Sequence, residues 1–328
     1  MEQVATLQAQ GPLKTTQVSV EGKWVSVSAI EINSRAVVTS GKWIKIAAIQ
    51  DEYWQATACE DPETYIRALR QSHGFSADIF AFMQKLPEVT PKYPYPVDWD
   101  NVAAIKLSTY QNWFDKLSPE TRRNVRLAAK RGVITRVVEF NDDLINAIVC
   151  INSESPLRQG RRFPHYGKDF AAVKRDYESF LDRSVYIGAY LNGELIAFLK
   201  IVCMGPVAGI MQLLSRMEHY DRKPANALIA KAVEHFCAAG KFSYLTYIRY
   251  HYGNKHKSPL TEFKRRNGFE EIAIPRFFVP LTTKGKIAIA LNLHRSLVEI
   301  LPEKAIYPLL ALRTKWQKFA MRSSGEVR

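Results

Sequence analysis

The stretch SVYIGAYLNGELIAFLKIVCMGPVAGIMQLLSRM, which runs from Ser184 to Met217, decides the fold class of this chain. It contains three apolar runs of strand length, and the pair Asn192-Gly193 separates the first two. Asn-Gly is the typical sequence of a tight hairpin turn, because both residues accept the positive φ that the turn requires. The stretch therefore predicts three consecutive strands that begin with an antiparallel hairpin.

The residues around this stretch predict helices and further strands in a regular order. Two helices precede the three strands, at 142–155 and 168–182. Pro224 and Gly240 delimit another helix just after them. The elements expected after the three strands are a helix at 224–240, a strand at 242–250, a helix at 259–268 and a strand at 269–281.

The first half of the chain shows weaker patterns of the same kind. Two segments that begin with Gly-Lys-Trp, at 22–32 and 41–51, alternate apolar and polar residues, so we expect two or three antiparallel strands there. A helix is predicted at 61–71, and a stiff, proline-rich crossing follows at 86–100. Two more strands are predicted at 102–108 and 133–140.

A basic helix is predicted between these last two strands, in the segment LSPETRRNVRLAAKRGV from 117 to 133. Ser118 caps it, Pro119 begins it and Gly132 ends it. At 3.6 residues per turn one face carries four cations, which are Arg122, Arg123, Arg126 and Lys130. This face is either a surface that binds a polyanion or an ordinary solvated face.

The net charge indicates partners that carry phosphate. Lys and Arg number 46 against 32 Asp and Glu, so the net charge is +14. Such an excess favours nucleic acid, nucleotide cofactors or an anionic membrane surface as partners. A merely basic protein is the alternative.

Targeting and cysteine patterns indicate a cytoplasmic protein. No apolar run approaches the roughly 20 residues of a membrane span, and the first residues contain no apolar signal core. The four cysteines lie far apart and include no C-x-x-C pair. We therefore expect buried thiols, and no metal site.

The order of the elements resembles the acyltransferase fold called GNAT, and the chain looks most like a Fem-type transferase, which carries two such domains in tandem. Two motifs carry this resemblance. The basic helix ends in Lys-x-Gly-Val at 130–133, as in the Fem-type pattern. The segment LTEFKRRNGF at 260–269 is similar to the Phe-Lys-x-x-x-Gly-Phe element of the same family.

The resemblance implies the fold class and the domain organisation. We expect an α+β fold with a mixed sheet, in which residues 1–138 form one GNAT-like domain and 139–282 form a second one with the acyl-donor cleft. A basic helical tail is expected at 283–328. This tail packs back on the domain, makes a peripheral contact with an anionic membrane, or extends a tRNA surface.

The resemblance also implies an acyltransferase that moves an acyl or aminoacyl group to an amine. Fem-type proteins take an aminoacyl group from tRNA, whereas ordinary GNAT enzymes take an acyl group from coenzyme A. We therefore expect aminoacyl-tRNA or acyl-CoA as co-substrate and no tightly bound cofactor. The expected acceptor bears an amine, and a nucleotide- or phosphate-linked molecule is one option.

The stretch RKPANA at 222–227 matches the loop that holds the pyrophosphate of the donor in GNAT folds. Ala225 stands where glycine is expected, and its Cβ hinders the approach of the backbone to a phosphate. Pro224 removes one amide donor. This departure disfavours coenzyme A and leaves phosphate binding to side chains, which are Arg222, Lys223, Asn226 and Arg265.

Three residues are candidates for catalysis. Lys264 matches the lysine of the Phe-Lys element, where the resemblance implies neutralisation of the tRNA terminus or stabilisation of the oxyanion. Glu218 follows one strand end and Tyr250 follows the next, which are the positions of acid–base residues in GNAT enzymes. The alternatives are a helix-end cation for Lys264 and an exposed turn residue for Glu218.

A polar loop completes the candidate site on the acceptor side. Its residues are Asn152, Arg158, Arg161 and Arg162, and a solvated loop is the alternative. Two rival functions share the fold: a non-catalytic protein that binds tRNA or an anionic membrane, and a scaffold that binds protein partners. The cleft near Lys264 separates them, because an enzyme needs it open and polar, whereas side chains plug it in the rivals.

Overall fold

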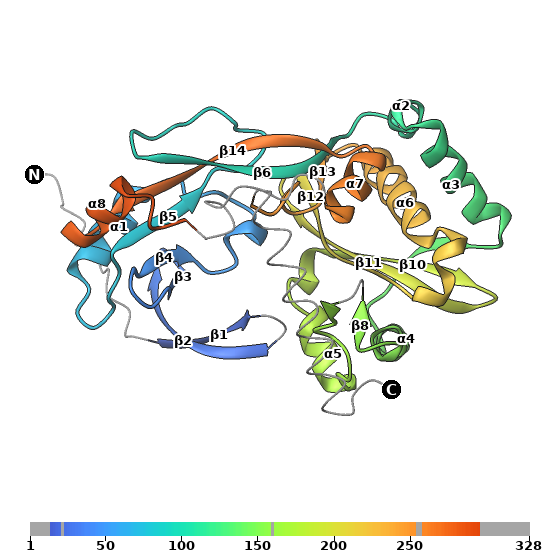
Figure 1. Ribbon diagram of the computed structural model, residues 1–328, viewed down its shortest axis with the longest axis horizontal. Helices are drawn as coiled ribbons and strands as arrows, with labels where there is room; N and C mark the ends of the chain where they lie inside the picture. The colour runs from blue at the N-terminus through green and yellow to red at the C-terminus, as the bar shows by residue number, and fades with distance from the viewer. Residues whose placement is uncertain (1–13, 21–22, 159–160, 254–257, 296–328) are drawn as a thin grey trace, which may run out of the picture. The chain divides into compact units, whose positions relative to one another are not determined.

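The computed structural model describes residues 14–20, 23–158, 161–253 and 258–295 (Figure 1). It has a mixed α/β fold, and its contacts divide it into two compact units. Unit 1 contains the described residues of 1–100 and 273–295, and unit 2 contains those of 101–272. No helix in the described part of the chain is long and apolar enough to cross a membrane.

Unit 1 is built on a sheet in which consecutive strands pair antiparallel up to β4. β4 then pairs parallel with β5, and β5 pairs antiparallel with β14. The strands are β1 (Lys14–Val20), β2 (Lys23–Ile32), β3 (Arg35–Ser40), β4 (Ile46–Ile49), β5 (Ile79–Met83) and β14 (Glu270–Pro280). The helices are η1 (Glu52–Trp54), α1 (Pro62–Gln71) and α8 (Thr283–Ala290).

Unit 2 has a sheet in which β7, β10, β11 and β12 pair antiparallel in that order. β12 then pairs parallel with β13, and β13 pairs antiparallel with β6. The strands are β6 (Val97–Lys106), β7 (Ile134–Val138), β10 (Ser184–Leu191), β11 (Glu194–Met204), β12 (Val207–Ser215) and β13 (Tyr244–Thr246). A separate short pair is formed by β8 (Leu157–Arg158) and β9 (Arg161–Arg162).

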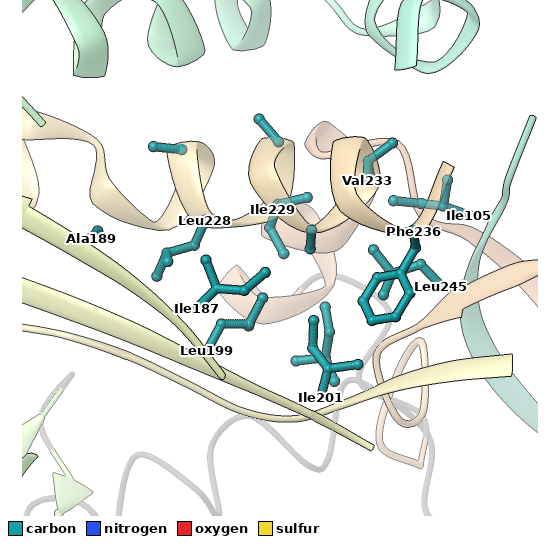
Figure 2. Close-up of a cluster of buried hydrophobic side chains, with 14 of the residues drawn as sticks. Ile105, Ile187, Ala189, Leu199, Ile201, Leu228, Ile229, Val233, Phe236 and Leu245 are labelled. Atoms are coloured by element: carbon teal, nitrogen blue, oxygen red, sulfur yellow. The ribbon is translucent and has the colours of Figure 1, made fainter. Parts of the chain in front are cut away.

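Helices surround the sheet of unit 2. They are α2 (Tyr110–Lys116), α3 (Pro119–Lys130), α4 (Asp142–Ser153), α5 (Phe170–Tyr177), η2 (Leu181–Arg183), η3 (Met217–Arg222), α6 (Pro224–Ala239) and α7 (Pro259–Arg266). Figure 2 shows Leu228 and Ile229 of α6 packed on Ile187 and Leu199 of the sheet, and Phe236 of the same helix beside Leu245 and Ile201. Successive side chains of a strand point to opposite faces, so Phe198 of β11 packs against α4 and α5 instead.

The two units repeat one layout. Three antiparallel strands are followed by a helix and by a strand parallel to the third, which gives β2-β3-β4-α1-β5 and β10-β11-β12-α6-β13. Each unit then takes its last strand from the other half of the chain, because β14 comes late in the sequence and β6 comes early. The repeat explains why both halves carry strand patterns of the same kind.

The predicted hairpin is confirmed, since Asn192 and Gly193 join β10 to β11 with φ of 51° and 85°. Two predicted strands are less than half as long as expected. The strand expected at 41–51 covers only 46–49, and the one expected at 242–250 covers only 244–246. The second ends early because Ile248 has φ of 46°, a conformation that a β-branched residue rarely adopts and that a strand excludes.

The contact units do not coincide with the segments 1–138 and 139–282. Residues 101–138 pack within unit 2, and the greater part of β14 packs within unit 1. The domain limits at 138 and 282 stay a prediction. Of the expected tail, α8 and the residues up to 295 belong to unit 1, and the rest lies outside the described residues.

Candidate functional site

The parallel strands of unit 2 separate after a short ladder, and we call this gap the unit 2 splay. Pairing between β12 and β13 runs from Val207 with Tyr244 to Gly209 with Thr246, whereas β12 continues to Ser215. In the described part of the chain, the buried hydroxyls of Ser215 and Thr246 have no hydrogen-bond partner. Buried polar atoms are nearly always paired, so these two hydroxyls are available to a ligand or to water.

Lys264 lies beside the end of β13. Its side chain is fully buried, and its amine donates to the carbonyl of Arg249. The amine also stands 4.7 Å from the ring centre of Tyr247 and 5.3 Å from that of Tyr252. Burial lowers the pKa of Lys264 to about 8. A buried cation without a carboxylate neighbour among the described residues is costly, which is typical of a functional position.

α7 holds Lys264 in place through both of its ends. Ser258 caps the start of α7, where its hydroxyl accepts from the backbone N–H of Thr261 at 3.1 Å. At the other end, the buried Asn267 accepts from the side-chain amide of Asn226 at 2.9 Å. Asn226, which the sequence predicts to bind a phosphate of the acyl donor, therefore links the first turn of α6 to the end of α7.

The start of α6 has an open N-terminus with cations nearby. Pro224 begins the helix as expected, and Lys223 precedes it with φ of 59° and without a side-chain cap. Arg222 is half-buried and contacts Asp221, which also accepts from Arg131 at the end of α3. A helix N-terminus without a cap presents amide groups and a positive dipole to an anion.

Two other candidates lie on the surface. Glu218 is exposed in η3 and pairs with Arg216 at 2.7 Å, so it lacks the burial expected of a general base at this position. Arg265 is exposed and makes two 2.8 Å bonds to Glu262, which also binds Arg266 at 2.6 Å. These arginines lower the pKa of Glu262 to about 2.

Tyr250 stands four residues after the end of β13, with its ring partly buried against the core of unit 2. Its backbone N–H donates to the carbonyl of Asn101 at 3.4 Å. Burial raises the pKa of Tyr250, which keeps the phenol protonated at neutral pH and able to donate a proton.

The acceptor-side residues divide into a buried pair and an exposed pair. Asn152 is fully buried on α4, and neither atom of its amide has a partner among the described residues. Arg158 donates to the carbonyl of Ser215 at 2.7 Å, which attaches this loop to the end of β12. Arg161 and Arg162 are exposed on β9. The loop therefore borders the unit 2 splay.

The basic face of α3 is on the surface of unit 2. Arg123, Arg126 and Lys130 are exposed, Arg122 is half-buried, and α3 packs against α6. Arg126 also lies over the ring of Phe114 at 5.2 Å. An open pocket of about 640 Å³ lies elsewhere, between β7 and α4, and contains none of the predicted site residues.

The corresponding gap in unit 1, the unit 1 splay, is filled. The ladder of β4 and β5 ends at Ala48 with Ala81, and the next free N–H of β5, that of Met83, donates to Glu52 at 2.7 Å. Arg276 of β14 donates to Glu52 at 3.1 Å and to Asp100 at 2.5 Å. Burial raises the pKa of Glu52, and Arg276 opposes this shift.

Sequence reasoning missed Glu154, Arg131 and Glu52. Glu154 accepts from the backbone N–H groups of Met217 and Glu218 at 2.7 and 3.0 Å, so it anchors the start of η3 to the acceptor-side loop. No motif marks Glu154 or Glu52, whose roles depend on long-range pairing. Arg131 directly follows Lys130 of the basic helix, and that position is the one signal available in the sequence.

This chain is similar to several solved structures, whereas no protein family model and no curated protein matches it. FemX matches with a TM-score of 0.54 at 8% identity, over 85% of this chain and 90% of that one. The C-terminal domain of a putative lysylphosphatidylglycerol synthetase from Agrobacterium fabrum matches with 0.51 at 14%, over 80% and 86%. L-PGS from Bacillus licheniformis matches with 0.52 at 11%, over 81% and 87%. This chain therefore has the fold of these proteins, as its resemblance to the Fem type implied.

Proposed function

We propose that this chain is an acyltransferase that binds its donor at the unit 2 splay and passes an aminoacyl or acyl group to an amine. One observation carries the proposal: the amine of Lys264 is buried beside the end of β13, where it contacts the carbonyl of Arg249 and the rings of Tyr247 and Tyr252, and no carboxylate among the described residues. Acyl transfer from an ester or thioester requires little else, because a positioned carbonyl and charge stabilisation supply most of the rate.

The proposed reaction is an addition followed by an elimination. The acceptor amine attacks the carbonyl carbon of the donor, and a tetrahedral oxyanion forms beside Lys264. The new C–N bond is kept and the C–O bond to tRNA, or the C–S bond to coenzyme A, breaks. The amine loses a proton to solvent water, and the leaving oxygen or sulfur gains one from Tyr250, the proposed donor, which then regains a proton from solvent.

Aminoacyl-tRNA is the donor that these residues favour. Ala225 and Pro224 disfavour the backbone cradle that a pyrophosphate of coenzyme A needs. The cations of α3 lie on a helix that packs against α6, whose N-terminus is uncapped. One of the similar structures is named a lysylphosphatidylglycerol synthetase, a name that joins an amino acid to a phosphate-bearing acceptor. Arg161 and Arg162 suit an acceptor of that kind.

A direct transfer assay tests this proposal. The full chain is incubated with radiolabelled aminoacyl-tRNA or with acyl-CoA, and with a panel of amines that includes phosphate-linked ones. The expected result is loss of label from tRNA that depends on both the chain and an amine. Binding of tRNA without any transfer would favour the non-catalytic rival instead, and transfer from acyl-CoA alone would overturn the choice of donor.

A further inference from the structure

An exposed apolar and basic surface lies on unit 1, away from the residues of the proposed reaction. Trp43 has 86% of its surface exposed, the largest fraction of any large apolar residue in the described part of the chain. On α8 and just after it, Ile287 is 55% and Leu291 is 62% exposed. Single exposed apolar residues are ordinary, but an exposed tryptophan beside two aliphatic side chains is a patch.

One contact and the helical spacing place these residues near one another. Lys284 donates from its amine to the carbonyl of Trp43, so the loop that carries Trp43 borders α8. Lys284, Ile287 and Leu291 follow one another at spacings of three and four, which puts them on one face of a helix. We call Trp43, Lys284, Ile287 and Leu291 the α8 patch.

The packing of α8 fixes this face outward. Gly285 lies so close to β5 that a Cβ there would stand 1.9 Å from the carbonyl oxygen of Asp78. Ala288 is buried in the same contact. Small residues therefore face the sheet, and no rotation of α8 can bury Ile287 without a collision with the backbone.

The charges around the α8 patch are predominantly positive, although Arg295 is paired with Asp98. Residues 40–49 contain Lys42 and Lys45, residues 281–295 contain Lys284, Lys286 and Arg295, and neither segment contains Asp or Glu. Asp78, which pairs with Lys284 at 3.3 Å, lies beneath the surface with 11% of its side chain exposed. Exposed tryptophan and aliphatic groups ringed by lysines are typical of surfaces that enter the headgroup region of an anionic bilayer.

We propose that the α8 patch docks unit 1 on the surface of an anionic phospholipid bilayer. Trp43 and Ile287 enter the boundary between headgroups and acyl chains, while the lysines contact lipid phosphates. A lysine near such a surface contributes roughly fivefold to the partition coefficient. We thus assign the membrane contact expected of the basic tail to α8, at the start of that tail, and to the loop of Trp43.

Vesicle sedimentation of the full chain tests the docking. Wild-type chain should sediment with vesicles of phosphatidylglycerol and phosphatidylcholine at low salt, and far less with phosphatidylcholine alone. The double variant Trp43→Ser, Ile287→Ser should bind the anionic vesicles at least tenfold more weakly. Trp99→Ser is the matched control, because Trp99 is also on unit 1 and 57% exposed, and it should bind as the wild type does.

Brominated lipids give a second readout that does not depend on other basic segments. They should quench the fluorescence of the wild type and of Trp99→Phe, and quench Trp43→Phe clearly less. Equal vesicle binding by the wild type and the double variant would overturn the proposal, and so would equal binding to neutral and anionic vesicles. Absence of quenching would overturn it too, because another part of the chain then covers the patch. Loss of tRNA binding in the double variant, with vesicle binding unchanged, would assign the patch to RNA.

Discussion

In both units a pair of parallel strands separates after three paired residues, β4 from β5 and β12 from β13. In unit 1 the carboxylate of Glu52 accepts a hydrogen bond from the N–H of Met83, just beyond the ladder, and Arg276 forms an ion pair with that carboxylate. In unit 2 the strand β12 runs six residues past its last pair with β13, and the hydroxyls of Ser215 and Thr246 have no partner among the described residues. One backbone layout thus forms an ion cluster in one unit and, in the other, a buried region with hydroxyls that are unpaired among the described residues.

The difference between the two splays lies in the side chains that follow the third strand of each unit. In unit 1 the third strand, β4, is followed closely by η1. There the amine of Lys85 donates to the carbonyls of Glu52, Tyr53 and Gln55. Its helix α1 is capped by Asp61, which repels an anion, whereas α6 has no side-chain cap. We therefore propose that the donor binds at unit 2 and that the unit 1 splay has a structural role.

The largest expected effect is on the stability of unit 1. Arg276→Met leaves the carboxylates of Glu52 and Asp100 without the guanidinium that neutralises them. The free energy of unfolding should fall by about 3–5 kcal/mol, measured by urea denaturation. Arg70→Met, at an exposed arginine of the same unit, should change it by less than about 0.5 kcal/mol. Identical midpoints for both variants would show that the ion cluster does not hold the unit 1 splay closed.

The next effect is on transfer at unit 2. Lys264→Met keeps the length of the buried side chain and removes its charge, so turnover should drop by roughly a hundredfold or more. Arg266→Met removes a cation two residues away that is paired with Glu262 and Glu120, and turnover should stay within about twofold. Equal small effects of the two variants, in the transfer assay and in melting temperature, would reduce α7 to a well-capped helix.

The pH profile sharpens the role of Lys264. Burial lowers its pKa to about 8, so the folded chain holds the ammonium below that pH and loses it above. Single-turnover transfer should fall about tenfold per pH unit above 8, and Lys264→Met should lose this inflection. The pKa of an unfolded lysine is about 10.4, so this group makes stability rise with pH between about 8 and 10.4. An unchanged profile in the variant would assign the inflection to another group.

The smallest expected effect concerns the basic face of α3. Changing Arg122, Arg123, Arg126 and Lys130 together to Gln should weaken tRNA binding, because fewer counterions are released. Each phosphate contact contributes about 0.7–0.9 to the slope of log K against log salt concentration. Loss of these four cations should therefore make the slope shallower by about 3. Filter binding over a salt series measures this slope. A slope that stays the same would leave α3 as a solvated face.

Local patterns predicted much of the fold of unit 2. Asn192-Gly193 predicts the hairpin, and Pro224 and Gly240 delimit α6 almost to the residue. The exchange of β14 and β6 between units could not be predicted, because strand pairing between distant segments has no local signal. β5 was not predicted either, because periodicity does not distinguish a short, fully buried strand from a buried piece of helix.

The candidate site was predictable only where a motif marks it. Lys264 comes from the Phe-Lys element, and its complete burial is a result of tertiary packing that the sequence does not display. Glu218 follows a strand end as expected, yet its place in η3 leaves it exposed. Glu52 carries no motif at all, because its role depends on Arg276, which is 224 residues away.

Hydrogen exchange with and without the donor tests most directly where the donor binds. The probe is a non-hydrolysable aminoacyl-tRNA mimic added to the full chain, with exchange followed peptide by peptide. New protection should appear in 210–228, which covers the end of β12 and the start of α6, and in 244–250 after β13. The equivalent segments of unit 1, 46–55 and 79–85, should exchange as before. Protection of the unit 1 segments, or none in unit 2, would contradict the assignment of the donor to the unit 2 splay.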